Sequence, residues 1–297
     1  MNKHGAAGHS SAPALALDTA PAAEARQIAG FRLRTPEERL AVAFQLGSWA
    51  MAASRDAIRR AQPSLSTLEQ AQLLYGLQFG SDRAHQVRRA LELEGPMSIP
   101  AALLPVVEVL EQLHVRYYIG GSIASIAYSL PRTTYDVDML VALEPEHAAT
   151  FIQSLQTDYY VDPESLLQAI AHRSSFNMTH QATHINIDVF VSAGRPFDDE
   201  QLRRVRPYLL PGAGRPVYLA SPEDIILNKL AWFELGNRVS DQQWRDIQSI
   251  LRVQGDALDL VYLRQWAHDL GLGSLLDLAL RGERPGPDAT TQQQRLF

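Results

Sequence analysis

The chain has 297 residues, of which 46% are hydrophobic and 20% are charged, and its formal net charge is -6. The length predicts more than one domain, the composition excludes extensive disorder, and the negative charge argues against broad binding to duplex DNA. The chain has no cysteine, which excludes disulfides, thiolate metal sites and a cysteine nucleophile.

The N-terminal third is expected to be a flexible tail followed by a small helical unit. Residues 1–30 are rich in Ala, Pro, Gly and Ser and show little periodicity, which is typical of a tail. The helical unit spans residues 31–95. Thr35, Pro36 and Glu38 match the start of a helix, with a capping side chain, a proline in the first turn and a glutamate that can close a capping box.

Two further helices are expected in this unit. One starts at Ser66, with Glu69 three residues later, and the other covers residues 84–93. The basic residues of the unit could face RNA or a protein partner, but solvated helix faces commonly carry such residues. We assign the unit no function.

Residues 96–220 are expected to form the core, a small mixed β-sheet with helices packed on it. The glycine and proline at positions 95 and 96 separate it from the helical unit. The expected elements are a helix at 100–114, a strand at 115–119, a helix at 122–129, a strand at 133–143, an edge strand at 159–161, and a hairpin of strands at 174–179 and 183–191. Residues 203–218 are expected to be mostly loop before a short strand at 217–219.

A C-terminal helical subdomain is expected over residues 221–281, followed by a polar tail at 282–297. Its predicted helices cover residues 221–235, 241–253, 259–270 and 274–280. The predicted fold class is therefore α+β, with a helical unit on each side of the sheet-containing core in the sequence.

Asp136 and Asp138 are predicted to project from the same face of a strand. Side chains two residues apart share a face, so Val137 and Met139 go to the core. At about 5 Å and an effective dielectric constant of about 20, two such carboxylates repel by about 3 kcal/mol. A hard divalent cation would neutralise them, and oxygen-only ligands favour Mg²⁺ or Mn²⁺. The alternative is a pair of solvated residues at a strand end.

Gly120, Gly121 and Ser122 are predicted to form an anion-binding turn. Glycines let the backbone approach phosphate oxygens, and Ser122 begins a helix whose N-terminal N–H groups and dipole attract anions. The turn alone is a weak signal, but it precedes the two aspartates by one helix. Arg132 and Thr133 come shortly before the two aspartates and could contact phosphate, or Arg132 could cap the helix. Neither is included among the predicted site residues.

The Gly-Gly-Ser turn, the helix and the Asp-x-Asp strand together resemble the signature of the DNA polymerase beta superfamily of nucleotidyltransferases. The match covers residues 118–141 closely. Residues 100–280 look like the smaller bacterial members, which include the AbiE-type toxin transferases and the minimal nucleotidyltransferases. The helical unit at 31–95 is not part of the signature.

This resemblance implies more site residues. Superfamily members carry a third carboxylate on a later strand, and Asp188 fits that position, on the strand face opposite the aliphatic residues. In the smaller members a lysine and an aspartate on later helices join the site. Lys229 and Asp246 occupy similar places, with Asp241 as a rival for the second.

The implied reaction moves a nucleoside monophosphate from a nucleoside triphosphate to a hydroxyl or phosphate of an unknown acceptor. Asp136, Asp138 and Asp188 would hold Mg²⁺ or Mn²⁺, and Asp246 would complete the catalytic set. The glycine–serine turn would bind the triphosphate, while Lys229 would both contact the nucleotide and compensate charge on the leaving group.

The acceptor stays open at this stage. A toxin-like enzyme would modify RNA or protein and could have a cognate antitoxin, whereas an antibiotic-modifying relative would use a small molecule. A different class of function is a catalytically silent, nucleotide-binding regulatory module, which retention of all three carboxylates disfavours.

The remaining sequence features are negative. The nine histidines include no pair with a carboxylate partner at zinc spacing. No window approaches the roughly 18 apolar residues of a membrane span, and the start lacks a signal-peptide pattern. We therefore expect a cytoplasmic protein without membrane contacts.

Overall fold

The computed structural model describes residues 20–67, 69–70, 72–74, 99–134 and 136–286. The chain divides into two compact units. Unit 1 comprises residues 1–33 and 226–297, and unit 2 comprises residues 34–225. The predicted helix at 84–93 lies outside the described residues. Among the helices that are described, none is long and apolar enough to cross a membrane.

Unit 2 contains a seven-stranded mixed sheet with the order β3-β4-β5-β2-β1-β7-β6. Its elements are α2 (Pro36–Ala61), α5 (Ile99–Gln112), β1 (Tyr117–Ile119), α6 (Gly121–Tyr128), β2 (Asp136–Val141), the short 3₁₀ helix η2 (Pro145–His147), α7 (Ala148–Leu155), β3 (Tyr159–Val161), α8 (Pro163–His172), β4 (Ser175–His180), β5 (Asn186–Val191), α9 (Pro196–Arg203), β6 (Arg206–Leu209), β7 (Pro216–Leu219) and the start of α10 (Pro222–Leu235). The sheet and its helices confirm the predicted α+β class.

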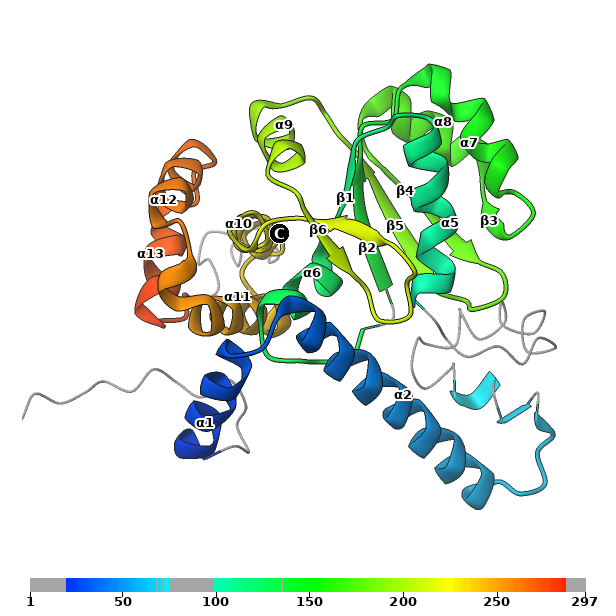
Figure 1. Ribbon diagram of the computed structural model, residues 1–297, viewed down its shortest axis with the longest axis horizontal. Helices are drawn as coiled ribbons and strands as arrows, with labels where there is room; N and C mark the ends of the chain where they lie inside the picture. Colours follow the sequence, from blue (N-terminus) through cyan, green and yellow to red (C-terminus); the bar gives the residue numbers. More distant parts are fainter. Residues whose placement is uncertain (1–19, 68, 71, 75–98, 135, 287–297) are drawn as a thin grey trace, which may run out of the picture. The chain divides into compact units, whose positions relative to one another are not determined.

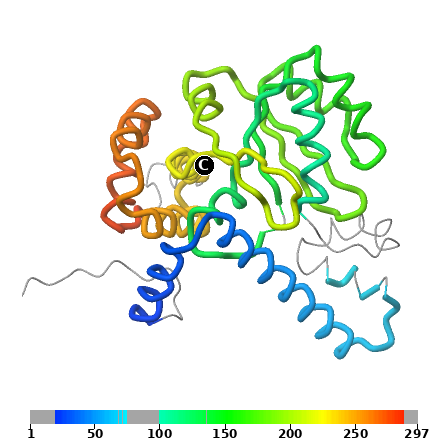
Figure 2. Tube along the Cα trace, in the orientation of Figure 1, coloured from blue at the N-terminus to red at the C-terminus, as the bar shows by residue number. Residues whose placement is uncertain are grey.

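The centre of the sheet combines parallel and antiparallel pairs. Strand β2 pairs antiparallel with β1 and parallel with β5, so β2 and β5 run side by side along their whole length (Figure 1, Figure 2). Strands β4 and β5 form the predicted antiparallel hairpin. Because β2 and β5 are parallel, their N-terminal ends lie at the same edge of the sheet.

The helices of unit 2 pack on the sheet and on one another. α8 packs on β4 and β5, and α7 packs on α5 and α8 (Figure 1). α2 packs along α6, where the buried Arg39 donates to the backbone carbonyl of Ala127 at 2.9 Å. The capping box predicted from Thr35 and Glu38 is present at the start of α2. The cap predicted from Ser66 is also present, with Glu69 as its partner.

Unit 1 is helical. It contains α1 (Pro21–Arg32), most of α10, α11 (Asp241–Gln254), the 3₁₀ helix η3 (Gly255–Ala257), α12 (Leu260–Asp269) and α13 (Gly273–Arg281). The bounds of α10 to α13 lie within two residues of the predicted ones, because each helix carries a clear local start or stop signal.

The prediction of a flexible tail over residues 1–30 is wrong for residues 21–30, which belong to α1. The reason is a tertiary contact rather than local sequence. Arg32 donates to the backbone carbonyl of Arg252 at 2.9 and 2.6 Å, and Arg252 pairs with the buried Glu24 at 3.4 Å. Together these bonds hold a weakly amphipathic helix against α11.

Several elements were absent from the predicted order. β6 lies within the segment expected to be loop, and its backbone is hydrogen-bonded to β7, a pairing that its exposed side chains do not indicate. The helices α7, α8 and α9 were also not predicted. For α8 a signal was present, because Asp162 caps the helix, accepting from Ser165 N–H at 3.1 Å, and Pro163 occupies its first position.

Candidate functional site

The first part of the candidate site is a pair of carboxylates on neighbouring strands of unit 2. Along β2, Val137 and Met139 are buried, whereas Asp136 is exposed and Asp138 is partly buried. β2 and β5 pair in parallel with Asp138 directly opposite Asp188. Adjacent strands lie about 4.8 Å apart and paired residues face the same side of a sheet. The structure therefore brings Asp138 and Asp188 together.

Asn186 adds a polar group that was not predicted. It pairs with Asp136 across the two strands, and its side-chain Nδ2 donates to Asp188 Oδ1 at 2.8 Å. The available signal was its position two residues before Asp188, which places both side chains on one strand face. The bond joins two side chains of β5 and restrains the Asp188 carboxylate.

The second part is the glycine turn, and its geometry depends on Asp138. Gly121 begins α6 with φ +50°, a conformation that favours glycine. A Cβ atom on Gly121 would lie 2.7 Å from Asp138 Cβ and closer still to its carboxylate. Gly120 donates its backbone N–H to the Asp138 carbonyl at 2.8 Å. The start of α6 is therefore held directly against Asp138.

The third part is an arginine beside the turn. Arg132 donates from Nη2 to the Ser122 hydroxyl at 2.6 Å and from Nη1 to the Thr133 carbonyl at 3.2 Å. Sequence reasoning set Arg132 aside, although its position just before β2 was the signal that could have included it. Its guanidinium adds a positive charge next to the N–H groups that open a helix, a combination that attracts anions.

The chemistry of these donors fits a hard divalent cation. Asp138 and Asp188 offer oxygen ligands side by side, and Mg²⁺ is commonly bound through one or two carboxylates together with substrate phosphates. In the described part of the chain, no group of three or more His, Asp or Glu side chains is arranged to hold a metal ion. Asp136 is exposed at the first position of β2. The metal site built on all three aspartates therefore stays a prediction.

In unit 1, Lys229 and Asp246 form a buried ion pair. Lys229 Nζ lies 2.8 Å from Asp246 Oδ2, and the two side chains are 7% and 6% exposed. Gln243 accepts from Lys229 at 3.0 Å, and Gln242 donates to the other Asp246 oxygen at 2.8 Å. Because a buried charge needs a partner, these residues depend on each other.

The rival Asp241 does not share this environment. It is the first residue of α11, its side chain is 59% exposed, and it pairs with Arg284. Of the two aspartates considered for the position next to Lys229, the structure therefore selects Asp246. Gln242 and Gln243 lie one helical turn before Asp246, so their side chains share one side of α11 and bond to Asp246 and to Lys229, respectively.

These arrangements define what the chain can do chemically. Unit 2 presents two adjacent carboxylates, a helix N-terminus held against one of them, and an arginine bonded to the second residue of that helix. This arrangement suits binding of a polyanion together with a cation. Unit 1 presents a buried lysine, Lys229, that is paired with Asp246. The structure thus brings the predicted residues together in two groups, one on each unit.

No family model matches the sequence. No curated protein is similar to it in a sequence search. Solved structures that are similar to the chain include an antigenic nucleotidyltransferase-like protein from Paracoccidioides brasiliensis, with 21% identity, a TM-score of 0.36, and coverage of 62% of this chain and 93% of that chain.

Two further similar structures are of proteins whose names refer to antibiotics. The antibiotic-resistance factor ANT(2'')-Ia has 16% identity and a TM-score of 0.39, with 59% of this chain and 93% of that chain covered. The lincosamide antibiotic adenylyltransferase LnuA, solved with lincomycin bound, has 15% identity and a TM-score of 0.34, with 52% and 94% covered. Likeness at this level says nothing about activity, so the function proposed for this chain depends on its own residues.

Proposed function

We propose that the chain is a metal-dependent nucleotidyltransferase, which moves a nucleoside monophosphate from a nucleoside triphosphate to a hydroxyl or phosphate group of an acceptor. One observation carries the proposal. Asp138 and Asp188 lie directly opposite each other on parallel strands, and Gly121 opens α6 against the Asp138 carboxylate. A structural role does not readily explain why a glycine at positive φ is held against a carboxylate that lies opposite a second one, since the two carboxylates repel each other.

The binding roles follow from charge. Asp138 and Asp188, with Asp136 as the further predicted ligand, would hold Mg²⁺ or Mn²⁺. The ion, when bound, would neutralise charge on the triphosphate oxygens. The first N–H groups of α6 and the guanidinium of Arg132 would bind the β- and γ-phosphates, with Ser122 linking the two through its hydrogen bond from Arg132.

The reaction itself is a substitution at phosphorus. An acceptor oxygen forms a bond to the α-phosphorus while the bond from that phosphorus to the bridging oxygen of the β-phosphate breaks, and pyrophosphate leaves. When the acceptor is a hydroxyl, its proton passes to a carboxylate oxygen of Asp188, which Asn186 holds in place. The substitution changes no oxidation state, so it needs no oxidant, reductant or second cofactor.

Lys229 has a separate proposed role, charge compensation for the leaving pyrophosphate. Its support is its position in a sequence pattern that resembles that of the small nucleotidyltransferases, and its buried pairing with Asp246 orients it. The pairing equally suits a purely structural role. Kinetics of the double variant Lys229→Met with Asp246→Leu separate the two roles, because it removes both buried charges. A purely structural role predicts that turnover returns with stability, whereas the catalytic role predicts that turnover stays low.

The acceptor divides the proposal further. A toxin-like enzyme of the AbiE type would label RNA or protein and slow growth when produced without a cognate antitoxin. An antibiotic-modifying enzyme would label a small molecule and leave growth unchanged. The regulatory alternative predicts nucleotide binding without pyrophosphate release.

The test uses the full chain with each α-labelled nucleoside triphosphate, Mg²⁺ or Mn²⁺, and a cell extract separated into RNA, protein and small molecules. We expect label in one fraction with the wild type and with Asp199→Asn, which removes an exposed carboxylate elsewhere in unit 2. We expect no label with Asp138→Asn or Asp188→Asn. Label that persists in either of these variants would contradict the proposal, and nucleotide binding without pyrophosphate would favour the regulatory module.

A further inference from the structure

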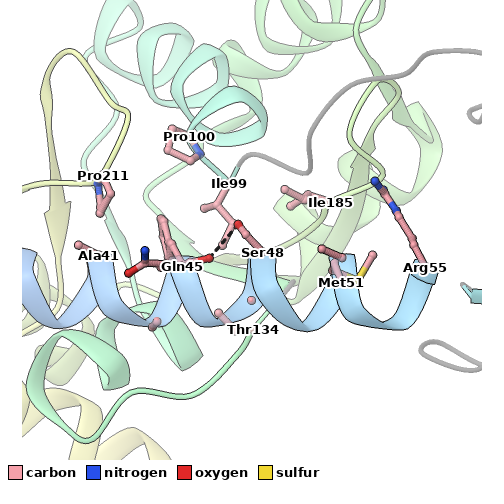
Figure 3. A pocket seen from close by; sticks show the side chains of 14 residues that line it. Ala41, Gln45, Ser48, Met51, Arg55, Ile99, Pro100, Thr134, Ile185 and Pro211 are labelled. Carbon is pink, nitrogen blue, oxygen red and sulfur yellow. Dashed lines mark hydrogen bonds between the residues drawn. The ribbon is translucent and has the colours of Figure 1, made fainter. Parts of the chain in front are cut away.

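A cavity of about 510 Å³ lies between α2 and the edge of the sheet where β2 and β5 begin (Figure 3). One wall is α2, which contributes Ser48, Met51, Ala52 and Arg55 among others. The opposite wall comes from the start of α5, from the residues that precede β2 and β5, and from the turn between β6 and β7. The volume falls within the roughly 300–1,000 Å³ of small-molecule sites.

The cavity is close to the paired carboxylates through the covalent chain. Thr134 lines it and precedes Asp138 by four residues, and Ile185 lines it and precedes Asp188 by three. An extended chain spans at most about 3.5 Å per residue, so the Cα atoms of these pairs lie within about 14 Å and about 10.5 Å of each other. A molecule bound in the cavity therefore lies near the N-terminal ends of both strands, with Asp138 and Asp188 further along them.

The lining is mainly apolar with a few polar groups. Ile99, Met51 and Ile185 contribute apolar surface, while Gln45 and Thr134 add hydrogen-bonding groups and Arg55 adds one positive charge (Figure 3). Among the described residues that line the cavity, none is acidic. A polycation would have no counter-charge there, so the chemistry favours an uncharged molecule with an apolar body and polar substituents.

We propose that this cavity is the acceptor site, and that the acceptor is a small, uncharged molecule that carries a hydroxyl group on an apolar body. The inference rests on the proposed nucleotidyl transfer, because it needs a donor held at the carboxylates. It also gives α2 a function. The helix forms the wall of the site that faces the strand ends, which explains why a helical segment outside the transferase signature packs along α6.

The test measures binding of a defined probe to the full chain. Phenyl glucoside has an apolar ring and sugar hydroxyls, and neamine provides a polycationic comparison. Ala52→Trp fills the cavity from an exposed position on α2. Ala53→Trp places the same side chain on the next, equally exposed residue outside the cavity. Saturation-transfer NMR reports probe binding, and calorimetry reports binding of ATP with Mg²⁺.

We expect phenyl glucoside to bind the wild type and Ala53→Trp, and to bind Ala52→Trp at least about 10-fold more weakly, which corresponds to about 1.4 kcal/mol. ATP should bind all three proteins equally, and neamine should bind none. Equal probe binding by Ala52→Trp, absence of probe binding by the wild type, or preferential binding of neamine would each overturn the proposal.

The same experiment separates this inference from the proposed function. Asp138→Asn should abolish label transfer but leave phenyl glucoside bound. If the wild type transfers label while Ala52→Trp transfers it equally well to the same acceptor, the cavity assignment fails and the transferase stands. If no nucleotide yields label although the probe binds in the cavity, the acceptor assignment falls with the proposed function.

Discussion

Replacing Gly121 with alanine is the most direct test of the candidate site. The residue has φ +50°, and the added Cβ would lie 2.7 Å from Asp138 Cβ and closer to its carboxylate. Real Cβ atoms do not approach other heavy atoms so closely, so the Asp138 side chain or the start of α6 must move. The substitution therefore tests whether the turn and the carboxylate form one rigid arrangement.

The expected loss of stability in Gly121→Ala has two contributions. A non-glycine residue in the left-handed region costs roughly 1–2 kcal/mol. Forcing packed groups apart costs roughly 1–3 kcal/mol more. We therefore expect Gly121→Ala to lower the free energy of unfolding of the unit by about 2–5 kcal/mol. Because a misplacement of about 1 Å at a reacting centre can lower a rate about 100-fold, nucleotidyl transfer should fall by at least that factor.

Gly194 provides the matched control. It lies in the same unit with φ +67°, and nothing lies within 4 Å of an added Cβ. Gly194→Ala should therefore show only the backbone cost of about 1–2 kcal/mol and keep full activity. Urea denaturation followed by circular dichroism gives both stabilities, and release of labelled pyrophosphate gives the rates. If Gly121→Ala is no less stable than Gly194→Ala, or is fully active, the packing argument is refuted.

Three further predictions concern other groups. Lys229→Met should lower the free energy of unfolding by about 3–5 kcal/mol, because it leaves Asp246 buried without its partner, and urea denaturation measures the loss. Burial lowers the pKa of His180 below its ordinary value of 6.5, so the unfolded chain binds more protons than the folded one. The stabilising contribution should therefore be full above about pH 6.5 and should be lost as the pH falls below it. Urea midpoints from about pH 7.5 to about pH 5.5 test this. Arg132→Ala should raise the KM for the nucleotide about 10-fold by removing the cation beside Ser122, which steady-state kinetics measures.

Each of these predictions has its own control. The double variant Lys229→Met with Asp246→Leu should recover most of the lost stability, since it removes both charges. His180 Nδ1 accepts from the Thr183 backbone N–H at 3.3 Å, so His180→Gln should flatten the pH dependence, and an unchanged slope would speak against the assignment. Arg215→Ala changes another arginine of unit 2, one paired with Glu111, and an equal rise in KM there would remove the case for Arg132.

Elements with local signals could be predicted from the sequence alone. The period of two in β2 and β5 predicted which of their side chains are buried, and the burial patterns agree. The cap at Thr35 and the helices of the C-terminal subdomain followed from residues within one turn of each other. Such features depend on backbone geometry over a few residues, which a single segment of sequence contains.

Other features arise only from contacts between distant segments. The pairing of Asp138 with Asp188 depends on strand order and register, and the helix α1 depends on bonds between Arg32 and Arg252, 220 positions apart. The choice of Asp246 over Asp241 depends on which side of α11 faces Lys229.

The cavity beside α2 likewise needs segments from α5, β2 and β5 to meet. Tertiary packing decided these features, because register, burial and enclosed volume are properties of pairs of segments rather than of either one alone.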